Sequence, residues 1–283
     1  MQGRSPSPAG SRAGGFALII VLWTLVLIAF IVAHMTASGR AEISIANNLV
    51  SNSVAQAAAD GAIFEAIFNQ SDPRPEQRWP ADGTTHEIVV GSSRVAVRLQ
   101  DEASWINPST ASPLLIEALL RVSGSDADSA HSLAAAISEW VGSATFPRPQ
   151  DVVLAEYRAA GLDYGPPGGP LETIGELGRV IGMTPEVLAA IRPHLTLFGP
   201  PQPNPATTDP VVTAALALAE PQTAQTPPPT NPAVPDMLTV RITAAAAGPG
   251  NARVVRAAVI RAGASLPQGY NLLAWSDEAT LTR

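Results

Sequence analysis

The sequence predicts an α+β fold, with a long N-terminal helix packed on an antiparallel sheet and an inserted all-helical domain. An apolar run begins at Phe16, and no proline interrupts the pattern between Pro8 and Pro73. Alternating apolar residues near 86–100 and again in 237–275 are typical of strands. Helix start signals gather between these two regions. The order helix, strands, helices, strands therefore places the helical domain within the sheet's own sequence.

Residues 16–35 are expected to form a transmembrane half of the N-terminal helix. The run FALIIVLWTLVLIAFIVA, from Phe16 to Ala33, carries no charge. At about 1.5 Å per residue it spans about 27 Å, just enough for the hydrocarbon core of a bilayer. Arg4 and Arg12 precede it, so the positive-inside rule predicts a cytoplasmic N-terminus and places the rest of the chain across the membrane.

The helix is expected to continue to about Asn69, because the apolar positions beyond the membrane segment keep a helical spacing. Ala57, Gly61, Phe64 and Phe68 follow one another at intervals of three and four residues. Residues 36–103 then contain the second half of this helix and a hairpin. Its strands are predicted around Ile88–Val90 and Val95–Leu99, with a glycine turn between them.

Residues 104–198 are predicted to form the inserted all-helical domain. Its helices are expected over 112–122, 129–141, 171–181 and 184–195; Gly182 ends the third, and Thr184 with Pro185 begins the fourth. Residues 199–236 are predicted to be a linker that builds no core, because Pro200–Pro235 holds eleven prolines. Within it, Val211–Ala219 is a candidate short helix. Residues 237–283 then supply strands near 238–242, 252–262 and 272–275, with a turn at 248–251.

The composition excludes several kinds of chemistry. The chain has 17 basic residues, all of them arginine, no cysteine, and a net charge of −7. Lysine Schiff bases, thiol nucleophiles and thiolate zinc sites are therefore impossible. A phosphate backbone requires a basic face, so no nucleic acid is expected as a partner. We find no catalytic motif, predict no enzymatic activity, and interpret His131 as a surface residue and His194 as a helix-terminal cap.

The junction at the start of the apolar run resembles that of type IV pilin and type II secretion pseudopilin precursors. Gly14-Gly15-Phe16 places a glycine directly before the phenylalanine that opens the helix. The resemblance implies that residues 1–15 are a leader, cleaved after Gly15 by a prepilin peptidase that also methylates Phe16. The fifth mature position is Ile20, where most members carry a glutamate. A subunit without that carboxylate cannot neutralise the N-terminus of a subunit ahead of it, which predicts a place at a filament tip.

Further motifs resemble the minor pseudopilin family called general secretion pathway protein K. They are Gly169-Pro170-Leu171, Glu176-Leu177, Gly182-Met183-Thr184-Pro185 and Pro193-His194-Leu195-Thr196. The resemblance runs from Gly15 to Phe198. It implies a tip subunit of the type II secretion pseudopilus that initiates assembly and supports export across the outer membrane. Its implied partners are other minor pseudopilins, the prepilin peptidase and the inner membrane, with the C-terminal domain in the periplasm.

The resembled family often carries an acidic calcium-binding loop after the tryptophan-bearing helix. In this chain the matching stretch, 140–147, lacks the acids, and Glu139, Asp151, Glu156 and Asp163 are loosely spaced. We therefore predict no metal and no other cofactor. Two alternatives to the secretion role stay open: a minor pilin of a type IV pilus, and a periplasmic domain on a single-pass anchor.

Overall fold

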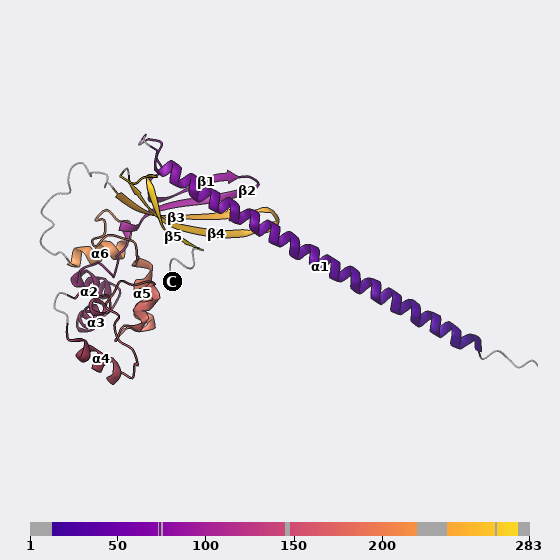
Figure 1. The fold of residues 1–283 in the computed structure, drawn as a ribbon, viewed down its shortest axis with the longest axis horizontal. Coiled ribbons are helices and arrows are strands. Elements are labelled where there is room, and N and C mark those ends of the chain that lie inside the picture. Colours follow the sequence, from indigo (N-terminus) through magenta and orange to yellow (C-terminus); the bar gives the residue numbers. More distant parts are fainter. Residues whose placement is uncertain are drawn as a thin grey trace, which may run out of the picture. The chain divides into compact units, whose positions relative to one another are not determined.

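The fold was obtained as a computed structural model (Figure 1). It describes residues 13–72, 74, 76–144, 148–219, 237–263 and 265–276, without the side chains of 13–17 and 35–42. The chain forms two compact units, Met1–Ser53 and Val54–Arg283. Residues 36–53, predicted as part of the sheet domain, therefore belong to the N-terminal unit. Helix α1, Ala13–Gln70, contributes to both units.

The second half of α1 packs on the sheet through small side chains. Ala55, Ala59, Ala62 and Ala66 are fully buried in this core, and Ile63 between them is buried as well. Alanine keeps helix propensity high and lets the helix backbone approach the strands closely. Alternating apolar residues of the strands form the other side of this core. They are Val95, Val97, Leu99, Val240, Ile242, Ala258 and Ile260. The predicted packing of helix on sheet is confirmed.

The sheet is antiparallel with the strand order β1-β2-β3-β4-β5. The strands are β1 Asp82–Val90, β2 Ser93–Asp101, β3 Met237–Ala247, β4 Arg253–Gly263 and β5 Tyr270–Ser276. The β1–β2 turn contains Gly91 at φ +59°, and the β3–β4 turn contains Gly250 and Asn251 at φ 64° and 63°. Left-handed backbone of this kind favours glycine and asparagine. Strands β2 and β3 are direct neighbours although the whole helical domain separates them in sequence.

The helical domain lies between β2 and β3 in the sequence (Figure 1). Its helices are α2 Pro113–Val122, α3 Ala127–Trp140, α4 Gln150–Ala159, α5 Pro185–Ile191 and α6 Pro210–Ala219, with the 3₁₀ turns η1 Glu102–Ser104, η2 Ile174–Arg179 and η3 Arg192–His194; a further 3₁₀ turn, η4 Pro249–Asn251, joins β3 to β4. The side chains of Ser112, Asp126 and Thr184 cap α2, α3 and α5. Leu119, Leu120, Ile137, Leu177 and Ile191 are among the buried residues of one shared core.

The structure of the helical domain differs from the sequence expectations in three places. The helix predicted over 171–181 is only the 3₁₀ turn η2, preceded by extended backbone at Thr173. Helix α4 was not predicted, because only Val153 and Tyr157 are buried in it and its apolar pattern is weak.

The predicted linker 199–236 is also wrong in its first part. Val212 and Ala215 of α6 are fully buried in the helical core, so 199–219 belongs to that domain. Asp209 caps the helix by accepting hydrogen bonds from the backbone N–H groups of Val211 and Val212. Residues 220–236 lie outside the described part of the chain.

Candidate functional site

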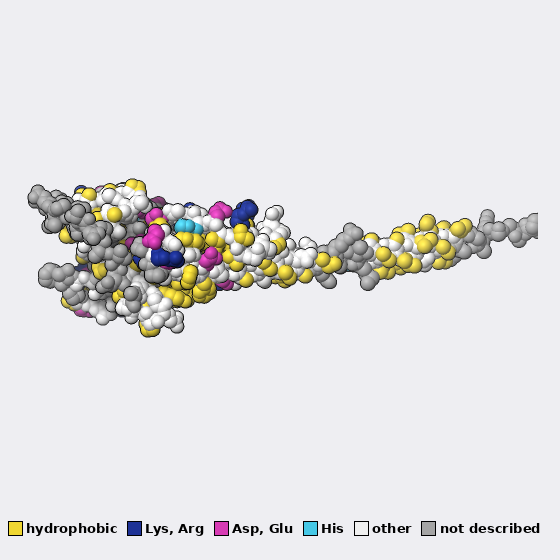
Figure 2. All heavy atoms as spheres, turned by 90° about the horizontal axis from the view of Figure 1, so that it is seen from above, with side chains coloured by type: hydrophobic (Ala, Val, Ile, Leu, Met, Phe, Trp, Pro, Cys, Tyr) yellow, Lys and Arg dark blue, Asp and Glu magenta, His cyan; other side chains and the backbone are white. Residues whose placement is uncertain are grey.

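The sequence places the processing site at the start of α1. Gly15 and Phe16 lie in the helix, but their side chains are outside the described residues. Ile20 is 48% exposed. From Leu18 to Val32 every large apolar side chain is exposed, between 48% and 72% (Figure 2). This continuous apolar surface contains no acidic side chain that could meet a neighbour's charge.

A search of the described residues for membrane spans finds no helix whose apolar stretch is long enough to cross a bilayer. The predicted segment 16–35 includes Phe16, Ala17 and Met35, whose side chains are not described.

The segment that leads from the sheet into the helical domain lies beside the segment that joins η3 to α6, and together they form a neck. We define the neck as the segments 101–107 and 194–207. Ile106 donates its N–H to the carbonyl of His194 at 3.0 Å, and Thr196 donates its N–H to Ile106 at 2.9 Å. The Asn107 amide donates to the carbonyls of Leu197 and Gly199 at 3.2 and 3.0 Å. The neck is therefore a backbone-paired joint, unlike a free linker.

A buried ion pair lies inside the neck. Glu102 is fully buried, and Arg241 of β3 is 12% exposed. The Arg241 Nε donates to Glu102 Oε1 at 2.7 Å, and Nη2 donates to Oε2 at 3.3 Å. The Thr196 hydroxyl donates to the same carboxylate. Both oxygens of a charge withdrawn from water are therefore satisfied, which a buried carboxylate requires.

Packing around the ion pair is tight. The Arg241 guanidinium carbon lies 4.9 Å from the ring centroid of Trp105, within the range of a cation–π contact. A Cβ at Gly199 would come within 2.8 Å of the Glu102 carbonyl oxygen, so only glycine fits at that position. Burial raises the pKa of the neighbouring Asp101 carboxyl, which caps η1 through the Ala103 N–H. These contacts hold the helical domain to one end of the sheet.

A second charged cluster joins two helices of the inserted domain. The Arg148 guanidinium donates through Nε and Nη2 to Glu139 at 2.5 and 2.8 Å, and through Nη1 and Nη2 to Glu156 at 2.6 and 3.0 Å. Glu139 lies in α3 and Glu156 in α4, so one side chain clamps both helices. The hydrogen bonds that Arg148 donates to Glu139 and Glu156 raise the pKa of Arg148, and the hydrogen bonding to Glu156 lowers the pKa of Glu156.

This cluster stands where the resemblance suggested a calcium loop. Two of the four acids considered, Glu139 and Glu156, do come together, but on a guanidinium that already neutralises both. Within the described residues no group of three or more histidines and acids could hold a metal ion. Calcium takes six to eight oxygen ligands, whereas the two carboxylates that meet here already bind the Arg148 guanidinium.

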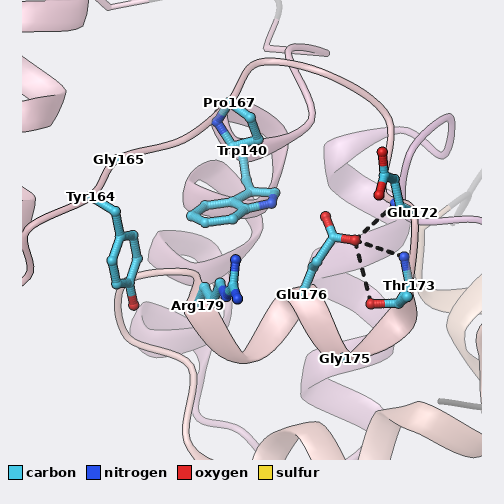
Figure 3. Close-up of a pocket in the computed structure, with 9 residues that line it drawn as sticks. All are labelled: Trp140, Tyr164, Gly165, Pro167, Glu172, Thr173, Gly175, Glu176 and Arg179. Carbon is cyan, nitrogen blue, oxygen red and sulfur yellow. Dashed lines mark hydrogen bonds between the residues drawn. The ribbon is translucent and has the colours of Figure 1, made fainter.

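A pocket of about 530 Å³ opens beside the end of α3 (Figure 3). Trp140, Tyr164 and Pro167 line it together with polar residues of η2 and the segment before it. Glu176 Oε1 accepts hydrogen bonds from the backbone of Glu172 and Thr173 at 3.0 and 2.8 Å. This carboxylate is thus used as the cap of η2. The lining residues include no histidine, lysine, cysteine or serine, and the Thr173 hydroxyl donates to Glu176 Oε1 at 3.3 Å.

The histidines serve structural contacts. His194 was predicted to cap helix carbonyls, but its Nδ1 lies 2.6 Å from Asp209 Oδ2, joining η3 to the cap of α6. His194 ends the 3₁₀ turn η3, Arg192–His194, which has Pro193 in its first turn. His131 is exposed and contacts Glu117 at 2.9 Å.

Sequence reasoning missed the Glu102–Arg241 pair and the Arg148 clamp. The first joins residues 139 positions apart, which no local pattern can reveal. A weak signal for the neck exists in Asp101-Glu102, two acids placed directly after an alternating strand.

We predict that Arg241→Met costs about 3–5 kcal/mol of unfolding free energy, because it leaves Glu102 buried without its cation. The double variant Glu102→Leu/Arg241→Met should recover most of that loss. Urea unfolding of the full chain in detergent measures both values. Arg158→Met, at an exposed arginine of α4, is the matched control and should stay within about 0.5 kcal/mol of the parent. A double variant as unstable as the single one would contradict the ion-pair explanation.

The Arg148 clamp should make stability depend on acid and leave it independent of metal. Since Arg148 lowers the pKa of Glu156 below its ordinary 4.5, the pair's contribution is present above that value and is lost as the pH falls through the lowered pKa. Arg148→Gln should therefore lower the melting temperature at pH 7 and weaken the acid dependence, whereas Arg158→Gln should do neither. EDTA should leave the parent's melting temperature unchanged; a fall on chelation would refute the assignment.

Comparison with known proteins is consistent with this architecture. Residues 97–201 match the family described as type II secretion system (T2SS), protein K. This range begins in β2 and contains the neck up to residue 201, the Arg148 clamp and most of the helical domain. None of the curated proteins matches the sequence significantly.

The fold itself has a solved counterpart. It matches a chain of the crystal structure of the GspK-GspI-GspJ complex of the type 2 secretion system from enterotoxigenic Escherichia coli, with a TM-score of 0.51 and 16% identity. The match covers 85% of this chain and 99% of that one. Residues 97–201 are thus similar to protein K of the type II secretion system, and the chain shares its fold with the matched chain of the GspK-GspI-GspJ complex.

Proposed function

We propose that the chain is the tip subunit of a type II secretion pseudopilus, where it initiates assembly and supports protein export across the outer membrane. The observation that carries the proposal is the exposed apolar surface of α1 from Leu18 to Val32, which contains no acid. In this role the chain works by assembly and has no catalytic activity.

In this proposal the apolar helix occupies two environments in succession, the inner membrane and then a bundle of helices. Before assembly, it holds the chain in the inner membrane, with the arginines Arg4 and Arg12 on the cytoplasmic side and the sheet and helical domain in the periplasm. A prepilin peptidase cleaves after Gly15 and methylates Phe16. During assembly, the same apolar surface packs against the helices of other minor pseudopilins. Both environments remove from water the side chains that are exposed in the isolated chain.

The tip position follows from charge and bulk. A subunit packed above this chain would need a carboxylate of this chain beside its own positive N-terminus. Ile20 offers none. An unpaired charge among packed apolar helices costs several kcal/mol. The rigid neck adds a steric reason, because it holds the helical domain on the sheet and obstructs a further subunit. Counterparts of GspI and GspJ, which accompany GspK in the solved complex, are the proposed partners.

Mass spectrometry of the mature chain from its native membrane tests this proposal. We expect the N-terminus to be Phe16 carrying a methyl group. Gly15→Leu should abolish cleavage, because the peptidase needs a residue without a side chain at the scissile bond, whereas Gly14→Ala should be processed normally. An intact Met1 in the parent chain would contradict pilin-type processing and favour a plain membrane anchor.

A further inference from the structure

The side of the sheet that faces away from α1 carries an exposed basic surface. Alternation along the strands places Val95, Val97 and Leu99 against α1 and their neighbours on the opposite side. Arg94 and Arg98 of β2 and Arg253 of β4 lie on that opposite side, and all three are exposed. We call this surface, with the residues between these arginines, the arginine face.

The strand register fixes the spacing of the arginine face. Arg94 pairs with Ala247, and Ala247 pairs with Arg253, so the three residues form one row across adjacent strands. Two strand spacings separate the arginine Cα atoms by about 10 Å. Arg98 lies four residues further along β2, at about 14 Å. The floor between them consists of small or apolar residues, namely Ala96, Ala245, Ala247 and Val255, and Val89 of β1 lies beside Arg94.

The charges of the arginine face are largely uncompensated. The chain as a whole has a net charge of −7, and several of its arginines bind carboxylates of the chain itself, among them Arg148, Arg241 and Arg256. In the described part of the chain, Arg94 and Arg253 make no ion pair, and Arg98 reaches only the Thr85 hydroxyl, at 3.4 Å. Glu87 of β1 is an acidic residue on the same side of the sheet, where it pairs with Ala96 of β2.

The same side of the sheet already binds a carboxylate at its other end. Arg241 of β3 lies on this side and holds Glu102 of the neck, with Trp105 against its guanidinium. There the chain covers its own sheet, and an arginine–carboxylate pair secures the cover. At the open end the arginines are in place, and among the described residues no carboxylate forms an ion pair with Arg94, Arg98 or Arg253.

We propose that the arginine face docks an acidic surface of another minor pseudopilin. This inference rests on the proposed function, since it names the surface that such a partner contacts. Charge complementarity selects an acidic partner, and planar guanidinium groups bind carboxylates through paired hydrogen bonds. The flat apolar floor between the arginines favours a protein over a lipid surface, because protein interfaces combine apolar contact with arginine anchors.

The experiment measures affinity between the full chain in detergent and its sibling minor pseudopilins from the same secretion system. Arg94→Glu/Arg253→Glu reverses two charges of the face, and Arg121→Glu/Arg158→Glu reverses two exposed charges of the helical domain. Both variants have the same net charge. We expect the first to lose at least tenfold in affinity and most of its salt dependence, and the second to change less than twofold. The neutral variant Arg94→Gln/Arg253→Gln should lie between the parent and the reversal.

The other outcomes overturn the proposal in distinguishable ways. Equal losses in the two reversal variants would show a general charge effect, and unchanged affinity in both would remove the face from the interface. Circular dichroism checks that each variant is folded, and if the reversal unfolds, the neutral variant alone must show a loss that the neutral control Arg121→Gln/Arg158→Gln does not. Nanodiscs with different phosphatidylglycerol contents test a lipid contact. If sibling affinity is unchanged and only the reversal variant binds these nanodiscs differently from the parent, the face contacts lipid and the proposal is wrong. A parent chain that binds no sibling would refute the proposed function, and this inference with it.

Discussion

The apolar surface of α1 is the constraint to which the rest of the structure responds. From Leu18 to Val32 it exposes a continuous series of large apolar side chains, each worth about 1.5–3 kcal/mol when fully buried. Such a helix needs a bilayer or other helices around it. The absence of an acid from this surface then limits which helices can surround it, since a charged neighbour would find no counterion there. Location and assembly are thus proposed consequences of one segment.

The second half of the same helix packs on the sheet and uses smaller residues to do so. Alanines replace the large apolar side chains on the face that meets the sheet, so the helix lies close to the strands. The sheet in turn carries the helical domain on a neck whose ion pair, Glu102–Arg241, is satisfied at every oxygen. A buried pair of this kind contributes a defined geometry more than stability. In the proposed role, that geometry keeps the helical domain in a fixed place on the sheet.

Local patterns predicted the elements far better than the contacts between them. The alternation of Val95, Val97 and Leu99 was sufficient for the hairpin, and Thr184-Pro185 was sufficient for α5. The helix expected over 171–181 is a 3₁₀ turn in the structure. Glu176 caps this turn, and its buried residues pack in the core of the helical domain. The proline content of 199–236 hid the buried face of α6, since composition averages over a segment that contains two kinds of structure.

Charged contacts were the least predictable features. Glu139 and Glu156 could be named as neighbours only through a resemblance that suggested a metal, and the structure gives them Arg148 instead. The neck pair and the arginine face depend on strand register between β2, β3 and β4, and the whole helical domain separates β2 from β3 in the sequence. The processing residues Gly15 and Phe16 stay predictions, because their side chains lie outside the described residues.

Imaging of the assembled pseudopilus with this chain labelled tests the account most directly. The proposed lack of a carboxylate partner at Ile20, together with the fixed helical domain, predicts one labelled subunit at a single end of each filament. Labels repeated along the shaft would show that further subunits pack above this chain, and would contradict the account.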